Sequence, residues 1–207
     1  MGVRRWLALC GVFAAIILAV GAIGRSDAPS EVNLSPQVQI YYRTNGALHQ
    51  IGAAALLLAA VLLVLFGARL WGLLGSGDGD GRLMAIATFG GAVLAAATVA
   101  AAAVAHLALV DAAHNRLSIA VRTLNLLDHY AILAAGVGLA AMFLAAGIAI
   151  VRTPVLPRGL GWAAIVIAAL AVAGPVGVAG IVAGSIWMLF VASLLVIKGT
   201  VEAEVAA

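Results

Sequence analysis

Long apolar runs alternate with short polar clusters along this chain, and the few charged residues lie almost entirely in the clusters. A transmembrane helix needs about 20 largely apolar residues to cross roughly 30 Å of hydrocarbon. The runs are apolar on every face, whereas a transmembrane β-strand alternates apolar and polar positions. They therefore predict membrane-spanning α-helices, of which the first four cover residues 6–24, 51–68, 84–110 and 131–151.

The final apolar stretch, Leu160–Ile197, contains no charged residue and is too long for a single crossing. Pro175 within it lacks an amide donor and disfavours helix at the preceding residue, so we place a hairpin turn there. Two further spans, 160–174 and 178–197, result. The expected fold is an all-α membrane protein, a six-transmembrane-helix bundle in which residues 1–207 form a single transmembrane domain. A five-span form with a kinked or re-entrant final segment is the alternative.

The composition agrees with a membrane environment. Hydrophobic residues make up 65% and charged residues 9% of the 207 residues, and the mean hydropathy is +1.20. A soluble fold of this length has too little interior to bury so much apolar surface. The 24 glycines indicate close packing, because small residues let helix backbones approach one another in lipid. Candidate packing positions are Gly90, Gly91, Gly136, Gly138, Gly180 and Gly184.

The basic residues predict that both termini are cytoplasmic, in agreement with the positive-inside rule. Of the eleven Lys and Arg residues, those in cytoplasmic segments are Arg4, Arg5, Arg69, Arg82, Arg152, Arg158 and Lys198, and those in outer segments are Arg25, Arg43, Arg116 and Arg122. Aromatic residues agree, since Trp6, Trp71 and Trp162 fall at inner boundaries and Tyr41, Tyr42 and Tyr130 at outer ones. We expect a multi-pass protein of a bacterial inner (plasma) membrane, whose basic segments meet anionic lipid and not nucleic acid.

Residues 1–24 allow two interpretations. Arg4 and Arg5 precede an apolar run with a small-residue site at Val20–Ala22, a pattern compatible with a cleaved signal peptide. We favour an uncleaved first span, because the run is long for a signal peptide and an even number of spans balances the charges. Cys10 is the only cysteine, which excludes an intramolecular disulfide and paired-cysteine redox or zinc chemistry.

Three polar segments between the predicted spans have recognisable features. The first outer loop, 25–50, is long enough to cap the bundle and includes an apolar–polar alternation at Val38–Tyr42. The stretch Gly75–Gly81 fits a flexible cytoplasmic linker, since it lacks the features of a calcium-binding or phosphate-binding loop. In the second outer segment, the helical spacing of Leu117, Val121 and Leu124 predicts a short interfacial helix near 113–127, or a tilted extension of span three.

All four histidines map to the outer side, and two aspartates lie at the same level. The spacings of Asp111 with His114 and of Asn125 with His129 place each pair on one helix face. Imidazole and carboxylate can bind Zn²⁺, Cu²⁺ or iron, and imidazole also changes its charge near neutral pH. Candidate ligands for a metal ion or haem are therefore His49, His106, Asp111, His114, Asp128 and His129. Since none of the strong metal-binding spacings occurs, interfacial histidines without a ligand are the simpler interpretation.

His106 is the histidine least easily explained by the membrane boundary. It lies about five residues inside the apolar run of span three, or roughly 7 Å along the helix axis. A polar side chain at that depth is expected to face the protein or a wet cavity. We therefore predict that His106 points inward and meets His129, Asp128 or His49. A neighbouring carboxylate would favour the imidazolium form, so a property of the protein should change between about pH 5 and 7.

The sequence contains no recognisable catalytic or transport signature. The other spans carry no charged residue, whereas coupled transporters usually place one near the midplane. Gly184–Ser185 resembles the nucleophile dipeptide of intramembrane serine proteases, but no histidine follows it as a base. We expect a protein that is not an enzyme: an accessory, structural or sensory membrane subunit without a cofactor. The alternative is a metal- or haem-linked redox or transport protein that uses the outer histidines. Expected partners are lipid, other membrane subunits, or a second copy through Gly180 and Gly184.

Boundary motifs from Tyr41 onward carry a resemblance to a known kind of protein. They are Gly46–Ile51 at the start of span two, Gly67–Trp71 at its end, and Val151–Trp162 with its proline, arginine, glycine and tryptophan before span five. In this layout the chain resembles a widespread family of small six-span bacterial membrane proteins of unknown function, typical of high-GC genomes. The resemblance covers about three-quarters of the chain. It implies a fold and no activity, so it assigns no functional residues.

Overall fold

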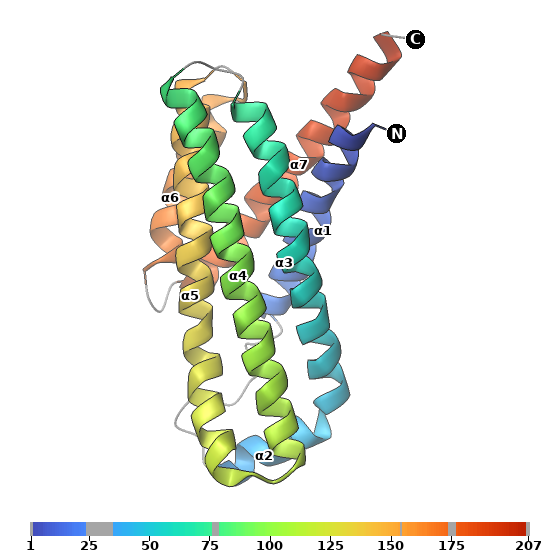
Figure 1. Cartoon of the computed structure of the whole chain (residues 1–207), viewed down its shortest axis with the longest axis vertical. Helices are drawn as coiled ribbons and strands as arrows, with labels where there is room; N and C mark the ends of the chain where they lie inside the picture. The colour runs from blue at the N-terminus through green and yellow to red at the C-terminus, as the bar shows by residue number, and fades with distance from the viewer. Residues whose placement is uncertain (1, 24–34, 76–78, 154, 174–176, 206–207) are drawn as a thin grey trace.

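The computed structural model describes residues 2–23, 35–75, 79–153, 155–173 and 177–205 (Figure 1). This part of the chain contains only α-helices, which confirms the all-α prediction for the described residues. In chain order the helices are α1 (Val3–Ile23), α2 (Ser35–Thr44), α3 (Gly46–Leu74), α4 (Asp80–His114), α5 (Ser118–Arg152), α6 (Arg158–Ala171) and α7 (Gly177–Val205).

Five of these helices, α1, α3, α4, α5 and α7, are long and apolar enough to cross a membrane. The chain is therefore a multi-pass membrane protein. Helix α6 is also apolar but has 14 residues, or about 21 Å at 1.5 Å per residue, which is less than the roughly 30 Å of a hydrocarbon core. The fifth span was predicted to reach residue 174, and the helix ends earlier, at Ala171. The turn predicted at Pro175 lies outside the described residues.

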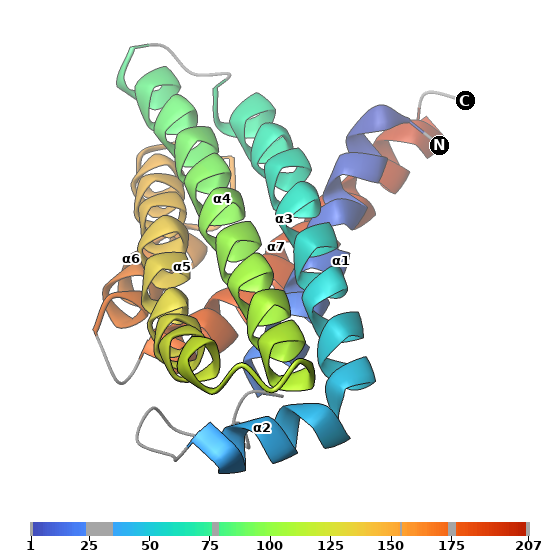
Figure 2. The same ribbon diagram turned by 60° about the horizontal axis from the view of Figure 1, so that its bottom comes forward.

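The three long helices α3, α4 and α5 stand side by side, with α4 in contact with both neighbours (Figure 1). Helix α7 runs obliquely beside α1, and α6 packs on α5. Both chain ends lie at one end of the bundle, called here the terminal end. Helix α2 lies across the opposite end, called here the α2 end (Figure 2). At the terminal end Arg152 donates a hydrogen bond to Asp80 at 3.3 Å, an exposed pair that adds little stability.

Glycines allow α4 and α5 to approach closely. A Cβ on Gly91 would overlap the backbone of Met142, and one on Gly138 would lie 2.5 Å from Cα of Ala95. In lipid such contacts supply much of the energy of helix packing, because an apolar side chain gains little by moving from lipid into the protein. The predicted role of glycines in close packing is confirmed at these two positions. Gly90 differs, because nothing lies within 4 Å of a Cβ built there.

Gly180 and Gly184 hold α7 against its neighbours within the chain. A Cβ on Gly180 would lie 2.5 Å from Cα of Ala171 in α6, and one on Gly184 would lie 2.5 Å from the ring of Phe143 in α5. Both glycines are buried. Their spacing of four residues therefore serves the internal packing of the bundle.

The α2 end has a small apolar core separate from the main core of the bundle. Val38 and Tyr42 of α2 pack there with Leu109 and Val110 of α4 and Val121 of α5. Helix α2 thereby covers the joined ends of α4 and α5, as Figure 2 shows.

The segment predicted as an outer cap loop, 25–50, is mostly helical in its described part. Residues 35–44 form α2 and α3 begins at Gly46, while residues 24–34 lie outside the described part. The alternation at Val38–Tyr42 is the amphipathic pattern of a helix: Val38 and Tyr42, four residues apart, are buried, and Ile40 is exposed. Residues on one helix face recur at this spacing. The same five residues also fit the alternation of a β-strand, because the segment is short.

No separate helix occupies 113–127, and the alternative, an extension of span three, holds only as far as His114. Helix α4 continues to His114, a turn follows in which Arg116 has a φ of 57°, and α5 begins at Ser118. Residues 118–127 are therefore the first turns of the helix assigned to span four. Two of its apolar residues face the small core beneath α2: Val121 is buried there and Leu124 packs against it, whereas Leu117 is 54% exposed. The short helix of this end is α2.

Candidate functional site

Three of the predicted candidate residues meet just inside the α2 end. His49 lies in the first turn of α3, His106 lies about two turns before the end of α4, and Asp128 lies about three turns into α5. The antiparallel hairpin of α4 and α5 places His106 opposite Asp128. The break between α2 and α3 at Asn45 starts α3 at a level where His49 reaches His106.

The three side chains form a hydrogen-bonded chain through His106. Its Nδ1 lies 3.1 Å from Oδ2 of Asp128, and its Nε2 lies 3.1 Å from Nδ1 of His49. The side chains of His106 and Asp128 are only 7% and 9% exposed. The prediction that His106 points inward and finds a partner is confirmed, with two of the three expected partners. We call these three residues the Asp–His–His chain.

The hydrogen-bond geometry limits how many protons the Asp–His–His chain can hold. An ionised carboxylate only accepts, so Nδ1 of His106 must donate to Asp128. The contact between His106 Nε2 and His49 Nδ1 needs one donor and one acceptor, and an imidazolium has no acceptor. At most one of the two histidines can therefore be charged while this bond exists. With Asp128 ionised, the intact Asp–His–His chain has a net charge of −1 or 0.

A proton on the Asp–His–His chain can move between the two histidines. If His49 takes up a proton at Nε2, its Nδ1–H can pass along the hydrogen bond to His106. The imidazolium of His106 then lies beside the carboxylate of Asp128. A second proton would leave two N–H groups facing each other across 3.1 Å, so the bond between the histidines would break.

Tyr42 covers the Asp–His–His chain from α2. Its ring centroid lies 4.8 Å from that of His49 and 5.6 Å from that of His106, edge-on in both cases. The ring of Tyr41 lies 5.3 Å from that of His49. The sequence predicts only a membrane-boundary position for both tyrosines, and the contact with the histidines was not predicted. The available signal was the four-residue spacing of Val38 and Tyr42, which indicates a helix with a buried face.

The other three candidates lie apart from the Asp–His–His chain and are exposed. Asp111 accepts a hydrogen bond from the amide of Asn115 at 3.2 Å, His114 lies against Gly46, and the ring of His129 contacts that of Tyr130. Asn125 and His129 are neighbours on the continuous helix α5, as their spacing predicts, but Asn125 is 5% exposed whereas His129 is exposed. The buried face of α5 instead carries Asn125 and Asp128.

The arrangement does not form a metal-ligand shell. Both ring nitrogens of His106 are directed at protein partners, so a metal ion would have to displace one of them. Among the described residues no group of three or more His, Cys, Asp or Glu side chains could hold a metal ion. A chain of donors and acceptors is suited to moving or storing a proton, whereas metal ligands converge on one point.

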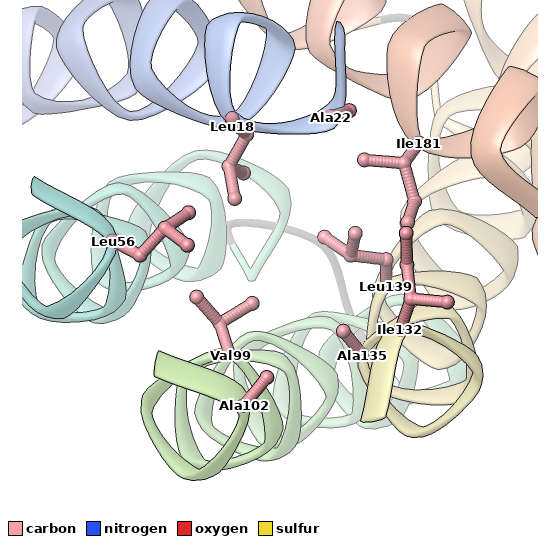
Figure 3. A pocket seen from close by; sticks show the side chains of 10 residues that line it. Leu18, Ala22, Leu56, Val99, Ala102, Ile132, Ala135, Leu139 and Ile181 are labelled. Carbon is pink, nitrogen blue, oxygen red and sulfur yellow. The ribbon is translucent and has the colours of Figure 1, made fainter. Parts of the chain in front are cut away.

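A cavity of about 340 Å³ adjoins the two histidines between α1 and α3. A smaller void of about 50 Å³ lies deeper in the bundle, where apolar side chains of α1, α3, α4, α5 and α7 point toward one another (Figure 3). Gly21 and Leu56 border both spaces. The histidines therefore lie at the polar end of an otherwise apolar space.

No family model, no curated protein and no solved structure matches this chain. The resemblance to small six-span bacterial membrane proteins therefore rests on the boundary motifs alone, and the site must be interpreted from its own chemistry.

Proposed function

We propose that this protein is a sensory or accessory subunit of a bacterial cell membrane, and that the Asp–His–His chain is its proton-responsive element. In this proposal the protein has six membrane segments, of which the short helix α6 is the fifth, both termini are cytoplasmic, and the α2 end faces outward. The position of both chain ends at the terminal end supports an even number of crossings (Figure 1). The excess of basic residues at that end supports its cytoplasmic assignment.

One observation carries the proposal: His106 is buried and is hydrogen-bonded at both ring nitrogens, to a carboxylate and to a second imidazole. A buried polar network of this kind is costly unless each group has a partner. Histidine is the side chain that changes charge within the physiological pH range. The network therefore couples a proton to the packing of three helices.

Tyr42 provides the link from proton uptake to a change in shape. The intact Asp–His–His chain can hold the first proton. The second proton breaks the contact between His49 and His106. Because the ring of Tyr42 packs against both imidazoles, their separation would displace α2 from the ends of α4 and α5. The titratable groups at this site are Tyr41 and Tyr42 from α2, His49 from α3, His106 from α4 and Asp128 from α5.

A distance measurement between α2 and α5 tests the proposal. Spin labels are placed at two exposed positions, Ile40 and Leu133, in a Cys10→Ala background in lipid nanodiscs. We expect the distance distribution to differ between pH 8 and pH 5, because acid separates the two imidazoles. His106→Leu should remove the difference, and the control His114→Leu, which changes an exposed histidine of the same helix, should keep it. Identical distributions at both pH values in the parent protein would rule out this function.

A further inference from the structure

The void of about 50 Å³ lies where five helices meet, each long and apolar enough to span the membrane. One apolar side chain from each helix illustrates its lining (Figure 3): Leu18 of α1, Leu56 of α3, Val99 of α4, Leu139 of α5 and Ile181 of α7. None of the described residues that border the void has a polar side chain. A buried water needs two to four polar partners, so the void excludes water and suits an apolar occupant.

The void adjoins the larger cavity between α1 and α3. Gly21 of α1 and Leu56 of α3 border both spaces. A Cβ built on Gly21 would lie 3.1 Å from Cδ2 of Leu56, so the two helices approach closely here because Gly21 has no side chain. Leu56 can change its rotamer. A flexible chain in the larger cavity can therefore reach the void past Leu56.

The larger cavity, of about 340 Å³, opens toward lipid. Ile16 and Val20 of α1 border it and are 46% and 65% exposed, and Leu48 of α3 borders it and is 70% exposed. Both helices are long and apolar enough to span the membrane. The phase that meets the sides of α1 and α3 is therefore lipid, and the molecule with direct access to the cavity is a membrane lipid.

The two histidines that border the larger cavity place no demand on its occupant. Both ring nitrogens of His106 and Nδ1 of His49 are hydrogen-bonded within the Asp–His–His chain. The other described residues that border the cavity are apolar. The occupant therefore needs no hydrogen-bonding group, and its contacts with the protein are those of close packing.

The void lies at a depth that one leaflet can reach. Ala102 and Leu139 border it, and each lies about eight residues inside the outer end of its predicted span, 84–110 or 131–151. Eight residues of helix correspond to roughly 12 Å, whereas half of the hydrocarbon core is about 15 Å thick. A lipid chain can therefore place its end in the void while the headgroup stays at the membrane surface.

We propose that an acyl chain of a membrane phospholipid lies between α1 and α3, with its terminal carbons in the void among the five helices. The larger cavity holds the middle of the chain, and the void holds its end. The chain supplies packing contacts that an empty void lacks, so it joins α1 and α3 to α4, α5 and α7. The site is separate from the proposed proton response, because no described residue that borders the void is titratable.

Photolabelling of the parent protein tests the site. The protein is placed in nanodiscs with a phospholipid that carries a diazirine at the end of one acyl chain, and the adducts are mapped by mass spectrometry. We expect adducts at Leu139 and Ile181, which are 1% and 6% exposed and so lie beyond the reach of bulk lipid. Val137 of α5 is 54% exposed and reports contact with bulk lipid. Adducts at Val137 with none at Leu139 or Ile181 would overturn the proposal.

Two neighbouring substitutions in α4 provide a matched pair. Ala102→Leu fills the void, because Ala102 borders it and is 7% exposed, whereas Ala101→Leu changes the exposed residue beside it. Ala102→Leu should reduce the adducts at Leu139 and Ile181 by about tenfold, equivalent to about 1.4 kcal/mol of binding. Ala101→Leu should leave them nearly unchanged. Equal yields from the two variants would contradict the site, and the mapping on the parent protein does not depend on the folding of either variant.

A free long-chain alcohol with a terminal diazirine distinguishes the source of the chain. Adducts at Leu139 from both probes would support a site that accepts the hydrocarbon chain whatever its headgroup. Adducts from the alcohol and none from the phospholipid would overturn the assignment to a membrane phospholipid. Ala102→Leu should keep the pH-dependent change between α2 and α5, so failure of the lipid site and failure of the proton response are distinguishable.

Discussion

Oδ2 of Asp128 lies 3.1 Å from Nδ1 of His106, in a contact where both side chains are at least nine-tenths buried. The two residues belong to adjacent antiparallel helices, α4 and α5, whose backbones approach closely through Gly91 and Gly138. The carboxylate of Asp128 is tolerated at this depth because it accepts a hydrogen bond from His106, whose ring can become positively charged. The pair therefore joins the packing of the bundle to a group that can take up a proton.

Removing the carboxylate should destabilise the protein. Asp128→Ala leaves the buried Nδ1–H of His106 without its acceptor, which costs on the order of 1–3 kcal/mol. Asp128→Asn should cost less, since the amide oxygen still accepts that hydrogen bond. The check is reversible unfolding in mixed micelles, with Asp111→Ala as the control because Asp111 is exposed at the same end. If Asp111→Ala lowers the free energy of unfolding as much as Asp128→Ala does, the buried contact adds no more stability than an exposed aspartate.

Truncating Tyr42 should loosen the α2 end without unfolding the bundle. Tyr42 is 1% exposed and belongs to the small core around Val38, Leu109 and Val121. Replacing a buried aromatic ring by alanine typically costs about 3–5 kcal/mol. Hydrogen exchange at fixed pH should accelerate in residues 36–49 of Tyr42→Ala and stay unchanged in α6. Tyr130→Ala, at a residue that is 53% exposed, should resemble the parent. Acceleration of exchange throughout the bundle would contradict a small core at the α2 end that is separate from the main core.

The glycine contacts between α4 and α5 predict contrasting effects for neighbouring substitutions. Gly91→Ala would place a Cβ against the backbone of Met142, and that backbone cannot move aside cheaply. Overpacking of this kind costs about 1–3 kcal/mol. Gly90→Ala meets nothing within 4 Å and should be neutral, or stabilising because alanine favours helix. Thermal unfolding in nanodiscs provides the measurement, and equal melting temperatures for the two variants would be inconsistent with this packing.

The proposed orientation predicts which cysteines a membrane-impermeant reagent can reach. In a Cys10→Ala background, Asn115→Cys at the α2 end should be labelled in intact cells. Gly159→Cys near the start of α6, where nothing lies within 4 Å of a built Cβ, should be labelled only after permeabilisation. Both positions are exposed, so burial does not account for a difference. The reverse pattern would invert the topology.

The sequence predicted the spanning helices and the inward direction of His106, because both follow from the cost of polar groups in hydrocarbon. A continuous apolar run can satisfy its backbone only as helix, and the depth of His106 required a partner. The sequence also named His49 and Asp128 as candidate partners, since they lie at matching depth.

Helix α2 was not predicted, because it depends on packing between segments that lie far apart in the sequence. Val38 and Tyr42 are buried by α4 and α5, which lie far along the chain. Without those partners, a ten-residue helix is marginal by itself, and its apolar residues also fit a boundary loop. The same core explains part of the apolar spacing that suggested an interfacial helix, because Val121 and Leu124 meet protein and not lipid, whereas Leu117 is exposed.

The central claim is that His49, His106 and Asp128 take up protons as one unit. The most direct measurement is nitrogen-15 NMR of the histidine side chains in nanodiscs between about pH 5 and 8. We predict that the signals of His49 and His106 change together, since one hydrogen bond joins the two rings. Independent changes of the two ring signals with pH would contradict the account.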